Sequence, residues 1–154
     1  MPAFVLCTLV FALDRVSKDA VLERFVLGES KEVIPGFFNL TLIQNTGAAW
    51  GILRGQGLWL TLLAFTALFF LLVMRRHFTY VGILPRIALG LLLGGITGNL
   101  SDRLIYGSVV DFLDFYIGTL RWPAFNVADS SICIGVGLYL IHSLQSAHQF
   151  KKNN

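Results

Sequence analysis

Residues 55–74, "GQGLWLTLLAFTALFFLLVM", contain no charged side chain, and the stretch is followed directly by Arg75, Arg76 and His77. An α-helix needs ~20 mostly apolar residues to cross the hydrocarbon core of a bilayer. The rest of the chain is also apolar, because 55% of all residues are hydrophobic and only 14% are charged, and the mean hydropathy is +0.70. The sequence therefore predicts an integral membrane protein.

Three further segments have the composition of membrane helices. One of them carries four glycines between residues 90 and 98, which would let neighbouring helices approach closely. We predict a single all-α integral membrane domain over residues 1–154. Its four transmembrane helices are expected at approximately residues 3–26, 56–74, 82–101 and 127–147.

The first of these helices carries charges at helical spacing. It can still cross the membrane if Asp14 and Lys18, one turn apart, face the protein interior. Arg15, Glu23 and Arg24 are then expected to reach the membrane interface.

Basic residues orient the chain, because loops rich in Lys and Arg stay in the cytoplasm. Three arginines lie between Arg75 and Arg86, and two lysines follow His148. Both termini are therefore predicted to be cytoplasmic, with residues 28–56 and 102–126 outside. This orientation explains the net charge of +3 better than nucleic-acid binding does.

The first outer segment alternates apolar and polar residues around "NLTLIQN". This alternation is typical of a strand, so we expect a small extracytoplasmic β-rich region on the membrane surface. Against the charge rule, Arg15, Lys18 and Arg24 lie in the outer half of the first helix.

Neither the cysteines nor the histidines have metal-ligand spacing. Cys7 and Cys133 lie in apolar runs, and His77, His142 and His148 form no H-E-x-x-H or similar pattern. We therefore predict no metal and no redox role for these residues.

Asp129 lies at the start of the last predicted helix, next to its apolar run. A carboxylate at the edge of the hydrocarbon is costly and suggests a functional site. An equally acceptable interpretation is a helix N-terminal acid that interacts with the helix dipole, with Asn126 as the cap.

A second group of polar residues occurs in "GNLSDRLIYGSVVDFLDFY", which contains Asn99, Asp102, Arg103, Asp111 and Asp114. Acids set among large apolar residues are partly desolvated, which favours protonation of one member of a pair. Two such carboxylates can act as an aspartic dyad, in which one member takes a proton from water while the other donates to the developing oxyanion. The residues alone leave the pair open among Asp14, Asp102, Asp111, Asp114 and Asp129.

Two other kinds of chemistry remain possible at this point. Four serines lie near the outer face, and Lys18 could activate one of them, although no G-x-S-x-G motif is present. Alternatively, Asp14, Asp111 and Asp129 could relay protons in a small carrier. A carrier should spread polar residues through the membrane, whereas here the second helix is wholly apolar and most acids gather at one face.

Four ordered motifs resemble those of the lipoprotein signal peptidases, the type II signal peptidase family. They are "DRVSK" at residues 14–18, "NTGAAWGI" at 45–52, "GNLSDRLIYGSVVDFLDF" at 98–115 and "FNVADSSI" at 125–132. Together they cover nearly the whole chain in the expected order.

The resemblance implies a role for each matched residue. It makes Asp111 and Asp129 the catalytic pair and leaves Asp114 as a neighbour. It also implies a set of residues that bind substrate or order the site, which are Asp14, Asn45, Gly47, Asn99, Asp102, Arg103 and Asn126. No cofactor is implied.

The resemblance further implies a bacterial prolipoprotein substrate whose cysteine carries a diacylglyceryl group and is cleaved on its amino side. The enzyme would lie in the cytoplasmic (inner) membrane among its lipids and act as a monomer, with its site near the extracytoplasmic face. The long outer loop would close over the lipid-bearing peptide, with Phe37, Phe38 and Trp50 at the interface.

Overall fold

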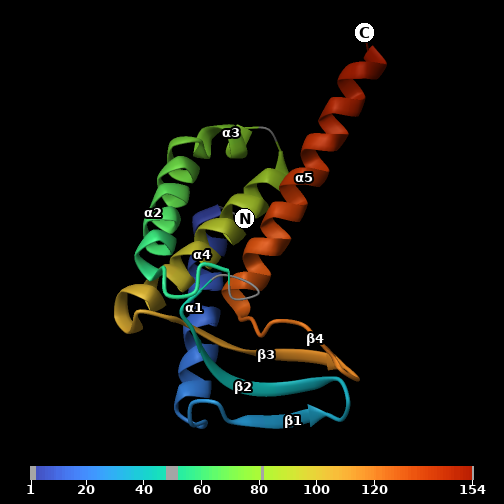
Figure 1. Ribbon diagram of the computed structural model, residues 1–154. Helices are drawn as coiled ribbons and strands as arrows, with labels where there is room; N and C mark the ends of the chain where they lie inside the picture. The colour runs from blue at the N-terminus through green and yellow to red at the C-terminus, as the bar shows by residue number, and fades with distance from the viewer. Residues whose placement is uncertain (1–2, 48–51, 81, 154) are drawn as a thin grey trace.

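The computed structural model describes residues 3–47, 52–80 and 82–153, with side chains for all of these except residues 79, 80 and 150–153. Helices occupy one end of the molecule and a small sheet occupies the other (Figure 1). The elements are α1 (Ala3–Leu22), β1 (Ser30–Ile34), β2 (Phe38–Asn45), α2 (Gly57–Val73), α3 (Arg75–Tyr80), α4 (Ile83–Tyr106), β3 (Val109–Ile117), β4 (Leu120–Arg121) and α5 (Val127–Asn153).

Helix α4 is the centre of the helical part and packs against α1, α2 and α5. Two of its glycines allow this close packing. A Cβ atom on Gly94 would lie 2.7 Å from Cβ of Val10 in α1, and one on Gly95 would lie 2.5 Å from the carbonyl oxygen of Ala128 in α5. The prediction that these glycines admit neighbouring helices is confirmed.

Two helices in the described part of the chain, α4 and α5, are long and apolar enough to cross a membrane. Helix α2 is apolar but shorter, and α1 carries the predicted charges. That α1 and α2 also cross the membrane therefore stays a prediction.

The helix bounds differ from those expected in three places. Helix α1 ends at Leu22 and not near residue 26, α4 continues beyond residue 101 to Tyr106, and α5 continues beyond residue 147 to Asn153. Helix α4 can continue because Asp102 is fully buried and paired with α1. It then ends at Gly107, whose left-handed backbone (φ 70°) places its N–H 3.1 Å from the carbonyl oxygen of Arg103. The short helix α3 was not predicted.

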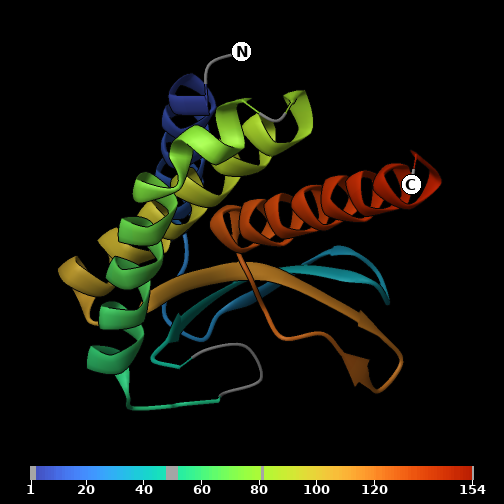
Figure 2. The same ribbon diagram turned by 90° about the horizontal axis from the view of Figure 1, so that it is seen from above.

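The sheet has the strand order β1-β2-β3-β4, and all neighbouring strands are antiparallel. Seen from above, it extends away from α1 and α2 in the direction in which α5 runs (Figure 2). The alternating segment "NLTLIQN" lies in β2, as predicted, whereas β3 was not expected as a strand.

Side-chain alternation along β3 separates its two functions. Val110 and Phe112 point to the face that packs against Leu42 and against Val21 at the end of α1. Asp111, between them, points to the opposite face. The apolar residues on either side of Asp111 thus anchor the strand that carries it.

The segment before α5 is fastened to β3 through Phe125. Its carbonyl oxygen accepts the N–H groups of Phe112 and Leu113 at 3.0 and 2.8 Å, and its N–H donates to the carbonyl of Leu113 at 3.0 Å. The first turn of α5 is therefore held beside the middle of β3, next to Asp111.

Candidate active site

Asp111 is 2% exposed and lies in the middle of β3. Two amide side chains donate to its carboxylate. The Nδ2 atom of Asn126 lies 2.8 Å from Oδ1, and the Nδ2 atom of Asn45 lies 2.9 Å from Oδ2. Asn45 is itself fixed, because its Oδ1 accepts the N–H of Gly47 at 2.9 Å in a tight turn.

Asp129 lies in the first turn of α5 and forms a reciprocal cap with Asn126. The N–H of Asp129 donates to Oδ1 of Asn126 at 2.9 Å, and the N–H of Asn126 donates to Oδ2 of Asp129 at 3.2 Å. This is a capping-box arrangement, so the interpretation of Asp129 as a capped helix acid is correct. The same carboxylate also faces a cavity, so capping does not exclude chemistry.

Two asparagines join the aspartates. Asn99 of α4 donates from Nδ2 to Oδ1 of Asp129 at 2.7 Å, while its Oδ1 lies 3.2 Å from Nδ2 of Asn126. Because Asn126 also donates to Asp111, a continuous path of hydrogen bonds links Asp111, Asn126, Asn99 and Asp129.

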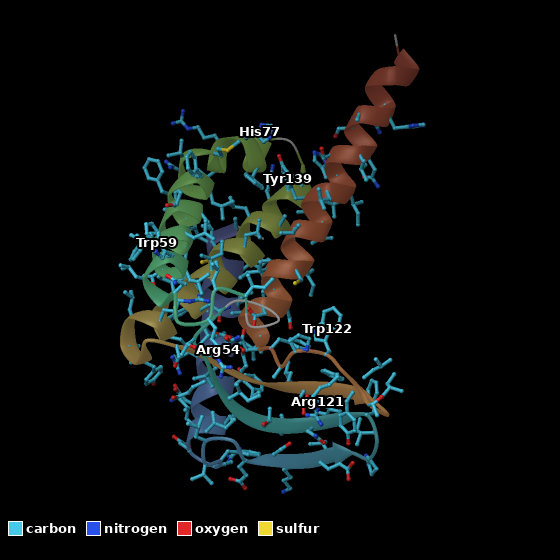
Figure 3. All side chains as sticks on the ribbon, viewed as in Figure 1. Arg54, Trp59, His77, Arg121, Trp122 and Tyr139 are labelled. Atoms are coloured by element: carbon cyan, nitrogen blue, oxygen red, sulfur yellow. The ribbon has the colours of Figure 1, made fainter. Side chains whose placement is uncertain are left out.

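Both aspartates line one cavity of ≈ 320 Å³. Besides the two aspartates, its polar lining comes from Asn45, Gly47, Asn99, Arg103 and Ser130. Its apolar wall includes Trp122, which lies beside the lower end of α5 (Figure 3). The remaining lining residues are Val109, Pro123, Ala124, Phe125, Ile132 and Cys133. An apolar cavity with two convergent carboxylates suits an extended, partly apolar substrate.

Burial and the neighbouring charge of Asp129 raise the pKa of Asp111 from 3.8 to about 7. The hydrogen bonds from Asn45 and Asn126 and the charge of Lys18 lower this pKa, but they do not offset the increase. One of the two carboxyl groups can therefore hold a proton near neutral pH. A site with one protonated and one ionised carboxyl can donate and accept a proton in the same reaction.

A second cluster of charges lies directly behind the cavity. Lys18 has no exposed surface, and its Nζ lies 2.8 Å from both Asp14 Oδ2 and Asp102 Oδ2. Arg15 contributes a further pair, because its Nη1 lies 2.8 Å from Asp102 Oδ1. Asp14 accepts the N–H of Ala128 at 2.9 Å and so fastens α1 to the start of α5.

Arg15 was predicted to reach the membrane interface, and this stays a prediction, because its side chain is partly exposed and also pairs with the half-exposed Asp19. Its second partner, Asp102, is shared with Lys18. Arg103, the next residue along α4, does not join this cluster, because neighbouring residues on a helix point about 100° apart. Arg103 turns to the cavity, and it makes no ion pair within the described part of the chain.

Lys18 was predicted to face the interior but was not counted among the site residues. Its one-turn spacing from Asp14 was the available signal. Asp114, in contrast, is buried away from the cavity, where it accepts from Asn39 and pairs with Arg121.

Lys18 does not contact any of the four outer serines among the residues described, because its ammonium group lies against Asn99, Asp14 and Asp102. Ser101, Ser130 and Ser131 donate to backbone carbonyls of Gly98, Asn126 and Val127. Ser108 is buried, and its Oγ has no hydrogen-bond partner in the same part of the chain. Nor do His, Cys, Asp and Glu side chains group in threes as a metal ion would require, within those same residues.

Two apolar helices in the described part of the chain are long enough to cross a bilayer, and acids gather at the sheet end, which fits a membrane enzyme. The chain superimposes on two solved structures of bacterial membrane enzymes, both determined by the in meso method and both 36% identical in sequence. One gives a TM-score of 0.87 and covers 94% of this chain and 88% of the other. The second gives a TM-score of 0.77 and covers 92% of each.

A model of the Signal peptidase (SPase) II family matches residues 6–145, and the chain belongs to this family of peptidases. It is 47% identical over 138 residues to a lipoprotein signal peptidase of Ralstonia nicotianae, covering 86% of this chain and 78% of the relative. It is 44% identical over 145 residues to that of Syntrophus aciditrophicus, covering 89% and 88%. The resemblance found in the motifs is thus confirmed.

Proposed function

We propose that this chain is a membrane aspartic endopeptidase that removes the signal peptide from diacylglyceryl-modified prolipoproteins, on the amino side of the lipidated cysteine. The relatives' name, lipoprotein signal peptidase, supports the substrate class. The observation that carries the aspartic mechanism is that Asp111 and Asp129 line one cavity and are joined through Asn99 and Asn126.

The proposed reaction needs one protonated and one ionised aspartate. The ionised carboxylate takes a proton from water as the water oxygen attacks the carbonyl carbon of the scissile peptide bond. The protonated carboxyl gives its proton to the carbonyl oxygen, which forms a neutral tetrahedral diol. The carbon–nitrogen bond then breaks as the amine nitrogen takes the proton that the first carboxylate had received from water. A diol hydroxyl gives its proton to the second carboxylate, which restores the starting state of the pair.

The surrounding residues have supporting roles in this proposal. Asn99 and Asn126 hold the two carboxylates, and Asn45 with Gly47 orders the opposite wall. Arg103, which faces the cavity, would hold a substrate carbonyl. Asp14 and Asp102 fix α1 and α4 behind the site.

We further propose that α1, α2, α4 and α5 cross the inner membrane of a bacterium as one domain, with both termini cytoplasmic. The sheet and the start of α5 lie at one end of the bundle, and α3 lies at the other (Figure 1). Because α3 begins with Arg75 and Arg76, the charge rule supports a cytoplasmic position for that end. The site would then face outward, where a membrane-anchored prolipoprotein presents its cysteine, and one chain would suffice.

A proton-relay carrier is not favoured. The family is one of peptidases, and α2 contains no charged residue.

Cleavage of a diacylglyceryl-modified prolipoprotein by purified protein in detergent, with a chelator present, tests the proposal. Wild type and Asp114→Asn are expected to cut before the lipidated cysteine, as read by mass spectrometry of the products. Asp111→Asn and Asp129→Asn are expected to lose turnover by roughly 10²–10⁴-fold or more. Cleavage by both of these variants at the wild-type rate would refute the dyad.

A further inference from the structure

Among the side chains that the structure describes, Lys18 is the one that touches both the buried charge cluster and the path between the two aspartates. Besides Asp14 and Asp102, its Nζ lies 3.0 Å from Oδ1 of Asn99. An ammonium group has three N–H donors, and here each has one acceptor. The ammonium is therefore fixed in position within the protein.

This contact decides which way the amide of Asn99 points. If the amide were turned over, its NH₂ group would face the Lys18 ammonium, donor against donor. Lys18 thus requires Oδ1 of Asn99 on its own side and Nδ2 on the other side, 2.7 Å from Oδ1 of Asp129. A buried cation thereby aims a hydrogen-bond donor at one aspartate of the pair.

Asp129 is the member that these contacts favour in its charged form. It receives the Asn99 amide, polarised by Lys18, and the backbone N–H of Asn126. It also lies at the N-terminal end of α5, where the helix dipole favours negative charge.

Asp111 has weaker support for a negative charge. It lies on a strand, so no helix dipole acts on it, and both of its donors are neutral amides. One of them, Nδ2 of Asn126, is shared with Oδ1 of Asn99 and the carbonyl of Val110, both at 3.2 Å. Two amide hydrogens thus serve three acceptors.

We infer that Lys18 is a positioning residue that acts through Asn99 to keep Asp129 ionised, so that the resting proton of the pair is held by Asp111. This inference rests on the proposed aspartic function. Asp129 is then the base that takes the proton from water, and Asp111 is the acid that gives its proton to the substrate carbonyl oxygen. The bonds formed and broken are those of the reaction proposed above. The inference adds only which aspartate is the base and which is the acid.

Other charged groups around the pair are compatible with this assignment. Arg103 of α4 lies near Asp129, and Asp14 and Asp102 are neutralised by Lys18 and Arg15. The raised pKa of Asp111 agrees with a proton held there near neutral pH.

Site-resolved titration of the aspartate carboxyl carbons by NMR, in detergent and without substrate, tests the inference. Each signal is assigned by its loss in the corresponding Asp→Asn variant, and the titration is read in the wild type. We expect the Asp111 signal to titrate near neutral pH while that of Asp129 keeps its ionised position. The reverse order would overturn the inference, whatever the cleavage assay shows.

The role of Lys18 is tested in a pair of variants that differ only at residue 18. Asp14→Asn keeps Lys18 with Asp102 and Asn99, whereas Asp14→Asn/Lys18→Met removes the cation without leaving an unpaired Asp14 carboxylate. Relative to Asp14→Asn, the double variant is expected to shift the Asp129 titration upward in pH. Its kcat should fall roughly 10- to 100-fold with little change in KM.

A further variant guards against misfolding. Asp14→Asn/Lys18→Gln keeps a donor for Asn99 but no charge, and it is expected to show the same upward shift of Asp129. Unchanged titration and kcat in the folded double variants, compared with Asp14→Asn, would show that Lys18 is structural only. Because the shift is read without substrate, this failure is distinct from absence of peptidase activity.

Discussion

The molecule contains two groups of acids removed from solvent, and the two groups differ in their hydrogen-bond and ion-pair partners. Asp14 and Asp102 lie within 2.8 Å of cationic nitrogens, with Lys18 contacting both and Arg15 contacting Asp102. Asp111 is just as buried and Asp129 is partly buried, and within the described residues both receive hydrogen bonds from neutral amide groups only. A buried acid paired with a cation is fixed as an anion, whereas one held by amides can gain and lose a proton.

The same contrast recurs within β3. Asp111 and Asp114 are three residues apart and therefore point to opposite faces. Asp114 pairs with Arg121 on the face away from the cavity, while no cation of the described chain is in direct contact with Asp111. The partner, and not burial, thus separates structural acids from those available for chemistry.

The largest effect on stability is expected from Asp102→Ala. It leaves Lys18 with only one carboxylate partner and removes the acceptor of the Val110 N–H, which lies 3.1 Å from Asp102 Oδ2. Breaking a fully buried pair in this way costs about 3–5 kcal/mol. Unfolding in detergent measures the loss, and Asp19→Asn is the control, because Asp19 pairs with Arg15 at a half-exposed position. An equal loss of stability in both variants would contradict the proposal that the buried ion pairs stabilise the fold more than the surface pair does.

A smaller effect is expected from pH. In the folded protein the pKa of Asp111 is raised from 3.8 to about 7. Between these two pH values the folded state holds a proton that the unfolded state has lost. The contribution of Asp111 to the free energy of unfolding is therefore fully present below pH 3.8 and is lost as the pH rises to about 7. The Tm of wild type should fall over this window relative to Asp111→Asn. Parallel curves would show that Asp111 has an ordinary pKa.

The same proton sets the upper limit of activity. Turnover is expected to decline as the pH rises above about 7, because Asp111 then loses the proton that it must donate. Activity that is constant well beyond this pH would argue against Asp111 as the proton donor.

The smallest effect is expected from Arg121→Gln. Arg121 is more than half exposed and pairs with the buried Asp114, so the change removes a surface ion pair worth about 0–1 kcal/mol. Turnover should stay close to that of wild type. A loss as large as that of Asp102→Ala would mean that Asp114 belongs with the site.

Much of the site could be predicted from the sequence, because its residues lie in ordered motifs. The structure places Asp111, Asp129, Asn99 and Asn126 in one hydrogen-bonded path and brings Asn45 to the same cavity. Part of the motif at residues 45–52, including Trp50, lies outside the described residues, so its expected position at the interface stays a prediction.

Other features depend on which way neighbouring side chains point, and this the sequence did not reveal. Arg15 and Arg103 are both near Asp102 in space, and only the packing of α1 against α4 selects Arg15 as its partner. The strand β3 was missed because its apolar residues flank acids, a pattern typical of a solvated loop as well as of a strand packed on both faces.

The central claim is that amide-held acids perform the chemistry while cation-paired acids support the fold. Turnover and Tm measured on the same preparations of Asp111→Asn and Asp129→Asn test it most directly. Both variants should lose turnover. The Tm of Asp111→Asn should stay at or above that of wild type, because the change removes a buried carboxylate that has a raised pKa. Asp129→Asn should lose about 0.3–1 kcal/mol at most, from the interaction of its charge with the helix dipole of α5. Turnover that persists in both, or a fall in Tm as large as that of Asp102→Ala, would contradict the account.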